Sequence, residues 1–203
     1  MHPDSFKTIE SPSRGLFKDK GSKFIALAYP VETEEDVFRN LENARKEYYD
    51  AHHHCFAYVL GQGRESFRLN DDGEPSGTAG KPIYGQILSK DLTNLLVVVV
   101  RYFGGTKLGT RGLINAYKGA TSDAFENSII NTRIIEFTLQ ISFNYLAMNE
   151  VMKVLKDNDL PQFGHQFDNE CVVLSSVRKS NSEKVIGQLE KIKSVVVSKI
   201  CKG

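Results

Sequence analysis

Hydrophobic and polar residues repeat with two different periods along this chain, which predicts a mixture of strands and helices. The segment KFIALAYPV, residues 23–31, is typical of a strand. Apolar residues then recur at helical intervals over residues 33–49, so a helix with one buried face should follow. Thr33 and Asp36 have the spacing of a capping box, and we expect this helix to begin there.

The next strands are expected at residues 54–61 and 65–70, joined by a Gly-containing connection that suits a hairpin. Residues 92–102 carry consecutive β-branched and apolar side chains, as expected for a central strand with both faces buried. Helices are predicted over residues 81–89 and, roughly, 113–127. These elements form the first of two patterns along the chain.

The pattern restarts at Ile134 with the order strand, helix, strand, strand, helix, strand. This βαββαβ order is that of ferredoxin-like domains. We therefore predict an α+β protein with an N-terminal domain over residues 1–133 and a ferredoxin-like C-terminal domain over residues 134–203. No low-complexity linker separates them, so the two domains are expected to abut.

Composition narrows the partners and the compartment. The formal net charge is +1, so no whole-molecule field attracts nucleic acid or membrane, and binding of either needs a local patch. Three cysteines without a CxxC pair favour a reducing compartment. The longest apolar run, residues 95–100, is far shorter than the ~20 residues that span a bilayer. With no signal-peptide pattern at the N-terminus, we expect a cytoplasmic protein without a membrane partner.

The first segment that indicates chemistry is DDGEPSGTAGKP, residues 71–82. Small residues let a ligand approach the backbone, hydroxyls donate hydrogen bonds, and amides at a helix start favour an anion. The segment therefore suits a phosphate or carboxylate cradle, although an ordinary polar loop has the same composition. Its candidate ligand-binding residues are Asp72, Glu74, Ser76, Thr78 and Lys81.

The second segment, GGTKLGTRG at residues 104–112, follows the central strand directly. No acidic residue occurs between Asp91 and Asp123, so this stretch is a local basic patch. Its glycines match neither the P-loop nor the dinucleotide fingerprint, and no cofactor is predicted. Alternatively, the glycines serve turns and the bases only solubilise the surface. The candidate phosphate-binding residues here are Arg101, Tyr102, Lys107 and Arg111.

Several arrangements for catalysis or metal binding are weaker. Carboxylates of the first segment could hold a divalent cation, but no metal-ligand spacing is present, and pairing with the bases of the second segment is the favoured alternative. His52 and His54 would share one face of a strand, yet no further zinc ligands are evident. No GxSxG elbow supports a serine triad with Ser76. No catalytic residue or metal site is assigned, and a binding protein is favoured over an enzyme.

The two segments, in this order and with the strand VVVVRYFGG between them, resemble the signature of the YigZ/IMPACT family. The segment AHHHCFAYVLG is similar to the family's strand ahead of the first motif, so the resemblance covers most of residues 1–130. The C-terminal half resembles the small domain of bacterial YigZ-like members, which is related to the last domain of elongation factor G. For the N-terminal domain, the resemblance implies the fold of the second domain of a small-subunit ribosomal protein.

The resemblance also implies a link to translation. Eukaryotic Impact-like members compete for an activator of a stress-responsive kinase, and for bacterial members an association with nucleic acid or the ribosome is implied. The leading hypothesis is therefore a translation-linked regulatory protein that binds RNA or the ribosome through its basic Gly-rich site, with Tyr102 or Phe103 available for stacking. The alternatives are an enzyme acting on a phosphorylated or carboxylated small molecule, with Asp72 and Glu74 as acid/base groups or metal ligands, and a regulator that binds a protein partner.

Overall fold

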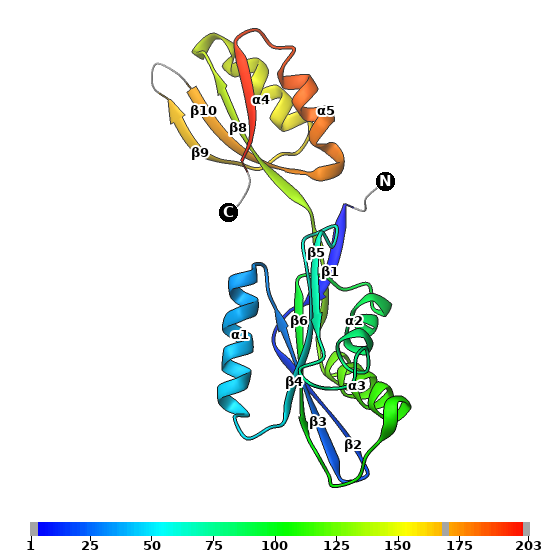
Figure 1. Cartoon of the computed structure of the whole chain (residues 1–203). Helices are drawn as coiled ribbons and strands as arrows, with labels where there is room; N and C mark the ends of the chain where they lie inside the picture. Colours follow the sequence, from blue (N-terminus) through cyan, green and yellow to red (C-terminus); the bar gives the residue numbers. More distant parts are fainter. Residues whose placement is uncertain (1–3, 168–170, 201–203) are drawn as a thin grey trace. The chain divides into compact units, whose positions relative to one another are not determined.

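The computed structural model describes residues 4–167 and 171–200, which form two compact units at residues 4–133 and 134–200. Figure 1 shows that each unit has its own sheet and its own helices. The mixed α+β class expected from the sequence is confirmed. None of the described helices is long and apolar enough to cross a membrane.

The N-terminal unit is built on a five-stranded antiparallel sheet with the order β2-β3-β6-β4-β5. The predicted central strand is β6, and its position in the middle of this order confirms that prediction. Outside this sheet, β1 pairs with β7. The strands are β1 (Ser5–Ile9), β2 (Ser13–Asp19), β3 (Ser22–Pro30), β4 (His53–Leu60), β5 (Ser66–Asn70), β6 (Leu95–Tyr102) and β7 (Ile130–Ile134).

Helices cover both faces of this sheet (Figure 1). Helix α1 (Glu34–Glu47) lies on one face, and α2 (Gly80–Ser89) and α3 (Gly109–Glu126) lie on the other. Along β6, Val97 and Val99 enter the core beneath α2 and α3, whereas Leu96 and Val98 enter the core beneath α1. Since side chains alternate along a strand, Arg101 lies on the α2/α3 face and Tyr102 on the α1 face.

The first helix begins as the sequence predicts. Thr33 Oγ1 accepts a hydrogen bond from the Asp36 amide at 3.1 Å, and Asp36 Oδ2 accepts one from the Thr33 amide at 3.2 Å. These reciprocal bonds form the expected capping box and satisfy two amides at the helix start.

Strand β2 packs against α3 at backbone distance. A Cβ atom on Gly15 would lie 2.2 Å from the backbone nitrogen of Ala124, so no larger residue fits there. The hydroxyl of Ser13 donates to the Ala124 carbonyl at 2.8 Å, and Asp123 accepts from the Leu16 amide at 2.7 Å. These contacts fix α3 against the sheet and so position its first turn.

The C-terminal unit contains a four-stranded antiparallel sheet with the order β11-β8-β10-β9. A short 3₁₀ turn at Tyr145–Ala147 precedes the first helix. The main elements follow the predicted βαββαβ order and are β8 (Glu136–Phe143), α4 (Met148–Asp157), β9 (Gln162–Phe167), β10 (Cys171–Arg178), α5 (Lys179–Leu189) and β11 (Val195–Ile200). The two helices and the sheet enclose one core, which includes Ile141, Val151 and Val185.

The structure also corrects the sequence prediction. It adds β1, β2 and β7, for which no strand was expected. Helix α3 begins at Gly109 rather than Leu113, so the end of the second Gly-rich segment is helical. Helix α5 begins at Lys179 rather than Ser182. Of the predicted last strand, Cys201 lies outside the described residues.

Candidate functional site

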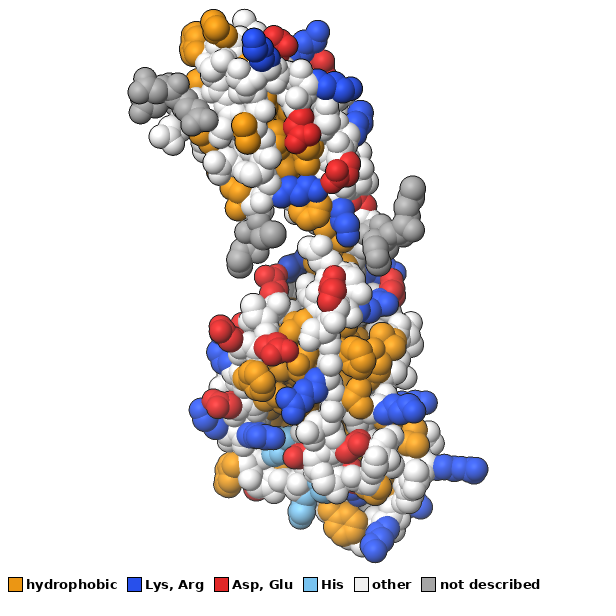
Figure 2. Space-filling view, turned by 45° about the horizontal axis from the view of Figure 1, so that its top comes forward, with side chains coloured by type: hydrophobic (Ala, Val, Ile, Leu, Met, Phe, Trp, Pro, Cys, Tyr) orange, Lys and Arg blue, Asp and Glu red, His pale blue; other side chains and the backbone are white. Residues whose placement is uncertain are grey.

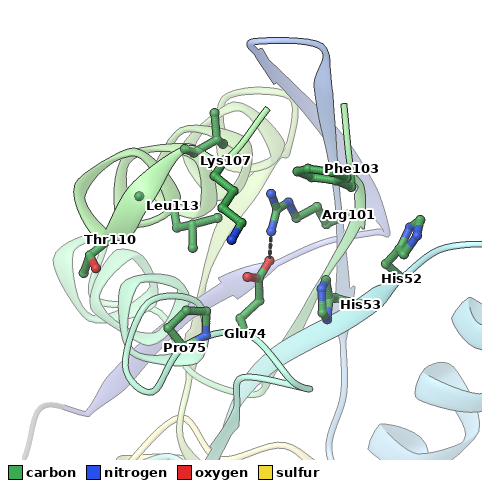
Figure 3. A pocket seen from close by; sticks show the side chains of 11 residues that line it. His52, His53, Glu74, Pro75, Arg101, Phe103, Lys107, Thr110 and Leu113 are labelled. Carbon is green, nitrogen blue, oxygen red and sulfur yellow. Dashed lines mark hydrogen bonds and ion pairs between the residues drawn. The ribbon is translucent and has the colours of Figure 1, made fainter. Parts of the chain in front are cut away.

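Both Gly-rich segments line one cavity of about 460 Å³ in the N-terminal unit, which we call the loop cavity. Glu74 and Pro75 come from the first segment, and residues 107–110 come from the second. Arg101 and Phe103 enter from the end of β6, and His52 and His53 from the start of β4. Figure 3 shows these side chains converging around Arg101 and Glu74.

A buried ion pair lies in the loop cavity. Arg101 Nη1 is 2.6 Å from Glu74 Oε1, and the hydroxyl of Tyr117 donates to the same oxygen at 2.8 Å. The two charged side chains are only 8% and 3% exposed, respectively. Pairing of this kind lets two charges remain buried, and it ties the first loop to the end of β6.

The groups behind this pair are protonated. Cys55 Sγ lies 3.2 Å from the Tyr117 hydroxyl and 3.0 Å from the Asp71 carbonyl oxygen. Burial raises the pKa of the Cys55 thiol well above its usual range, and it does the same to the pKa of the Tyr117 phenol. A thiol in this state is a poor nucleophile. The network therefore has the character of a structural support for Glu74.

Arg101 keeps an unused hydrogen-bond donor. Its guanidinium lies between two aromatic rings, with Cζ 5.4 Å from the centroid of Phe24 and 5.6 Å from that of Phe103. Its Nε atom is buried and has no hydrogen-bond partner among the described residues. A buried donor without an acceptor costs about 1–3 kcal/mol.

The start of α3 forms another wall of the loop cavity. The preceding loop turns at Gly105 and Gly109, whose φ angles of +84° and +71° favour glycine. Leu108 is the N-cap residue, its side chain accepts no hydrogen bond from the helix, and the first turn contains no acidic residue. In the described part of the chain, no acceptor is found for the amides of residues 109–111, which precede the first intrahelical bond. Such a helix start favours an anion.

Lys107 stands directly before this helix start. Its side chain is exposed and lines the loop cavity. In Figure 3 its amine points toward the Arg101–Glu74 pair. A flexible cation, a buried guanidinium and an uncapped helix therefore converge on one space.

The start of α2 is different because the chain's own carboxylate occupies it. Asp71 accepts hydrogen bonds from the amides of Gly77, Ala79 and Gly80 at 2.8, 3.0 and 2.8 Å. The anion cradle expected in the first segment is thus filled by Asp71. Asp72 Oδ2 accepts from the His54 amide at 2.6 Å, so it also orders the loop.

Three of the nine candidate residues line the loop cavity, and the other six do not. Glu74, Arg101 and Lys107 line the loop cavity. Tyr102 lies on the opposite face of the sheet and donates to Asp50 at 2.7 Å, a bond that raises the pKa of its hydroxyl to about 12. The remaining candidates, none of which lines the cavity, are Asp72, the buried Thr78, and the exposed Ser76, Lys81 and Arg111.

The structure adds residues to the site that were not among the nine candidates. Thr110 and Leu113 line the cavity because α3 begins earlier than expected. His52 and His53 line it because β4 pairs with β6, which sets His53 opposite Arg101. Among the described residues, no three His, Cys, Asp or Glu side chains are grouped to hold a metal ion.

Comparison with known proteins gives one consistent family. A family model for the Impact N-terminal domain matches residues 20–125. The IMPACT family member YigZ of Escherichia coli is 39% identical over 137 residues, which cover 66% of this chain and 67% of that protein. The IMPACT family member YvyE of Bacillus subtilis is 32% identical over 154 residues, covering 76% and 71%.

The similarity extends to a solved structure and to a eukaryotic relative. A crystal structure described only as that of a hypothetical protein aligns with a TM-score of 0.70 at 26% identity, covering 99% of this chain and 100% of that one. The protein IMPACT homolog of Saccharomyces cerevisiae matches a shorter part, at 32% identity over 94 residues, or 45% of this chain and 36% of that protein.

Proposed function

The chain belongs to the YigZ/IMPACT family, and from this premise we propose that it is a translation-linked regulatory protein that binds RNA, free or in the ribosome, through the loop cavity. One observation carries the RNA-binding part of the proposal. The uncapped start of α3 and the cations Arg101 and Lys107 face the same space, and Glu74 is the only acidic residue among the described residues that line it. This arrangement suits a phosphate group.

The charge distribution supports a local site. On the face of the N-terminal unit drawn in Figure 2, positive and negative side chains are interspersed, which agrees with the net charge of +1. The acid-free stretch between Asp91 and Asp123 departs from this mixture. Its exposed cations, Lys107, Arg111 and Lys118, supply the positive charge that RNA phosphates require.

Phe103 is the aromatic ring best suited to stack on a base. It is 45% exposed, lines the loop cavity, and lies against the Arg101 guanidinium. A base stacked on this ring would bring its phosphate toward Lys107. Tyr102 is excluded from this role because it lies on the opposite face of the sheet.

The contacts in the cavity support binding rather than catalysis. Glu74 is held by both Arg101 and Tyr117, and Asp72 is engaged by the His54 amide. A general base needs a carboxylate that can reach a substrate proton, and these contacts restrain both candidates. The enzyme alternative is therefore less favoured.

The proposal also includes the fold of each of the two units and the location of the protein in the cell. The sheet order β11-β8-β10-β9 with two helices on one core supports a ferredoxin-like C-terminal domain at residues 134–203. Family membership supports the ribosomal-protein domain 2-like fold for residues 1–133, as well as a cytoplasmic location.

The test is equilibrium binding of labelled single-stranded and structured RNA across a salt series. Lys107→Glu/Arg111→Glu should weaken binding strongly and flatten the dependence of log K on log salt by about 1.4 units, because each lost phosphate contact on a single strand contributes about 0.7. The charge-matched control Lys153→Glu/Lys156→Glu, on exposed positions of α4, should have a much smaller effect. An absence of binding at low salt, or equal losses in the two double variants, would contradict the proposal.

A further inference from the structure

The net positive charge of the loop cavity is larger than the single negative charge of a phosphodiester. Arg101 and Glu74 neutralise each other, which leaves the full charge of Lys107. The start of α3 adds the equivalent of about half a positive charge, giving roughly one and a half in all. A phosphodiester carries one negative charge, whereas a phosphate monoester carries about one and a half to two at neutral pH. The charge of the cavity therefore matches a monoester better.

The buried arginine gives independent support for a bound anion. The side chain of Arg101 is 92% buried, since only 8% is exposed, and it lines the cavity. Its Nη1 is used by Glu74, while Nε is without an acceptor among the described residues. A monoester has three terminal oxygens, so it can accept from the helix amides, from Lys107 and from this guanidinium together.

The dimensions of the cavity favour a single nucleotide-sized group. Its volume of about 460 Å³ lies in the range of small-molecule sites, roughly 300–1,000 Å³. In Figure 3, Lys107 and Thr110 lie on the α3 side, and His52 and His53 lie across the cavity from them. A terminal phosphate of an RNA strand, or a free nucleotide, needs room for a nucleoside on one side of the phosphate only. An internal phosphodiester has nucleotides attached on both sides, so the cavity would have to admit the strand on both sides of the phosphate.

We propose that the loop cavity selects a phosphate monoester, carried by an RNA end or by a free nucleotide, over the diesters within an RNA strand. This inference rests on the proposed function for the location of its site. The phosphate lies at the first turn of α3, Lys107 and Arg101 donate to its oxygens, and Phe103 flanks the attached base.

The test uses one internally labelled single-stranded RNA in three forms: with a 5′-phosphate, with a 3′-phosphate, and with hydroxyls at both ends. Adenosine monophosphate and adenosine are titrated separately by calorimetry. At least one phosphorylated end should bind about ten-fold or more tightly than the hydroxyl form, as expected for added charged hydrogen bonds. Adenosine monophosphate should bind and adenosine should not.

Two variants separate binding from folding. Lys107→Met removes the cation, and its preference for phosphorylated ends should disappear. Thr110→Glu places a carboxylate at the exposed start of α3, where it favours the helix but competes with the ligand, so its Tm should hold or rise while the preference is lost. The matched control Lys90→Met, at the exposed C-cap of α2 and outside the cavity, should keep the preference.

Each outcome separates the two proposals. Equal affinity for all three RNA forms would overturn the monoester inference and leave RNA binding intact. Binding of adenosine monophosphate without binding of any RNA would support the monoester site and contradict the proposed function. A failure of every probe to bind would overturn both, and a preference that survives in Lys107→Met and Thr110→Glu would show that the phosphate lies elsewhere.

Discussion

The buried pair of Arg101 and Glu74 makes a sharp prediction about stability. Glu74→Gln keeps the shape of the side chain and an oxygen that can still accept from Tyr117, but it removes the negative charge. Arg101 is then left buried without a counterion. Removing one partner of a buried ion pair costs about 3–5 kcal/mol. The rings of Phe24 and Phe103 still stabilise the guanidinium, so we expect a loss near the lower end, about 3 kcal/mol.

This loss of unfolding free energy can be measured directly in the N-terminal unit. With no tryptophan in the chain, hydrogen exchange of the β6 amides during urea unfolding is a suitable measurement, because β6 belongs to that unit alone. A loss of about 3 kcal/mol corresponds to a fall in Tm of roughly 10 °C for a domain of this size. Ligand affinity should move in the opposite direction, since Glu74 is the only acidic residue lining the cavity in the part of the chain that the structure describes.

The control makes the same chemical change in an exposed ion pair. Arg14 and Glu47 are 2.8 Å apart, but their side chains are 64% and 45% exposed. Water screens such a pair, so Glu47→Gln should change the unfolding free energy by less than about 1 kcal/mol. A loss below 1 kcal/mol in Glu74→Gln would refute the argument, because it would mean that burial does not strengthen the Arg101–Glu74 pair.

Three further predictions concern the frame around the site. Burial lowers the pKa of His54 below its ordinary 6.5, so the folded state binds fewer protons than the unfolded state, and the unfolding free energy should fall as pH drops below 6.5. His54→Gln should reduce that fall, which a comparison of urea midpoints at pH 7.5 and 5.5 measures. Gly15→Ala should lower the unfolding free energy by about 3 kcal/mol or more, because its new methyl group would meet the backbone of α3. Gly85 in α2 has open space around it, so Gly85→Ala should raise the unfolding free energy by about 0.5–1 kcal/mol. Similar urea midpoints for the two variants would contradict the packing of β2 on α3. Thr33→Ala should cost about 1 kcal/mol in thermal unfolding through loss of the capping box, and an unchanged Tm would count against that contribution.

The sequence predicts the elements that have a strong hydrophobic period. The central strand and the first helix were found because apolar residues recur at regular intervals and a capping box marks the helix start. The missed strands β1 and β7 have only five residues each, and β2 carries three charged residues among its seven. β7 is exposed along its whole length, so its side chains leave no alternating pattern to detect.

The start of α3 was missed for a local physical reason. Gly109 and Gly112 are poor helix formers, so the segment has the composition of a loop. In the fold, the helix nevertheless extends to Gly109, where a positive φ is required. Packing against β2 holds the helix in place, and that contact joins residues far apart in the sequence. Local propensity therefore could not place the first turn.

The site was predicted in part for similar reasons. Glu74, Arg101 and Lys107 come from the two motifs, and charge and glycine content mark both motifs in the sequence. Tyr102 was included as a ring available for stacking, but strand alternation places it on the face opposite Arg101. The role of Asp71 in filling the start of α2 depends on the path of one loop, which composition does not determine.

The most direct test of the proposed binding site follows the backbone amides by NMR during titration with a short single-stranded RNA. The largest saturable shifts should occur at residues 109–111, where the amides are uncapped. The amides of Ala79 and Gly80 serve as an internal control, since Asp71 already accepts from them and they should move little. Shifts concentrated on another surface, or no shifts at all, would contradict the assignment of the loop cavity as the RNA-binding site.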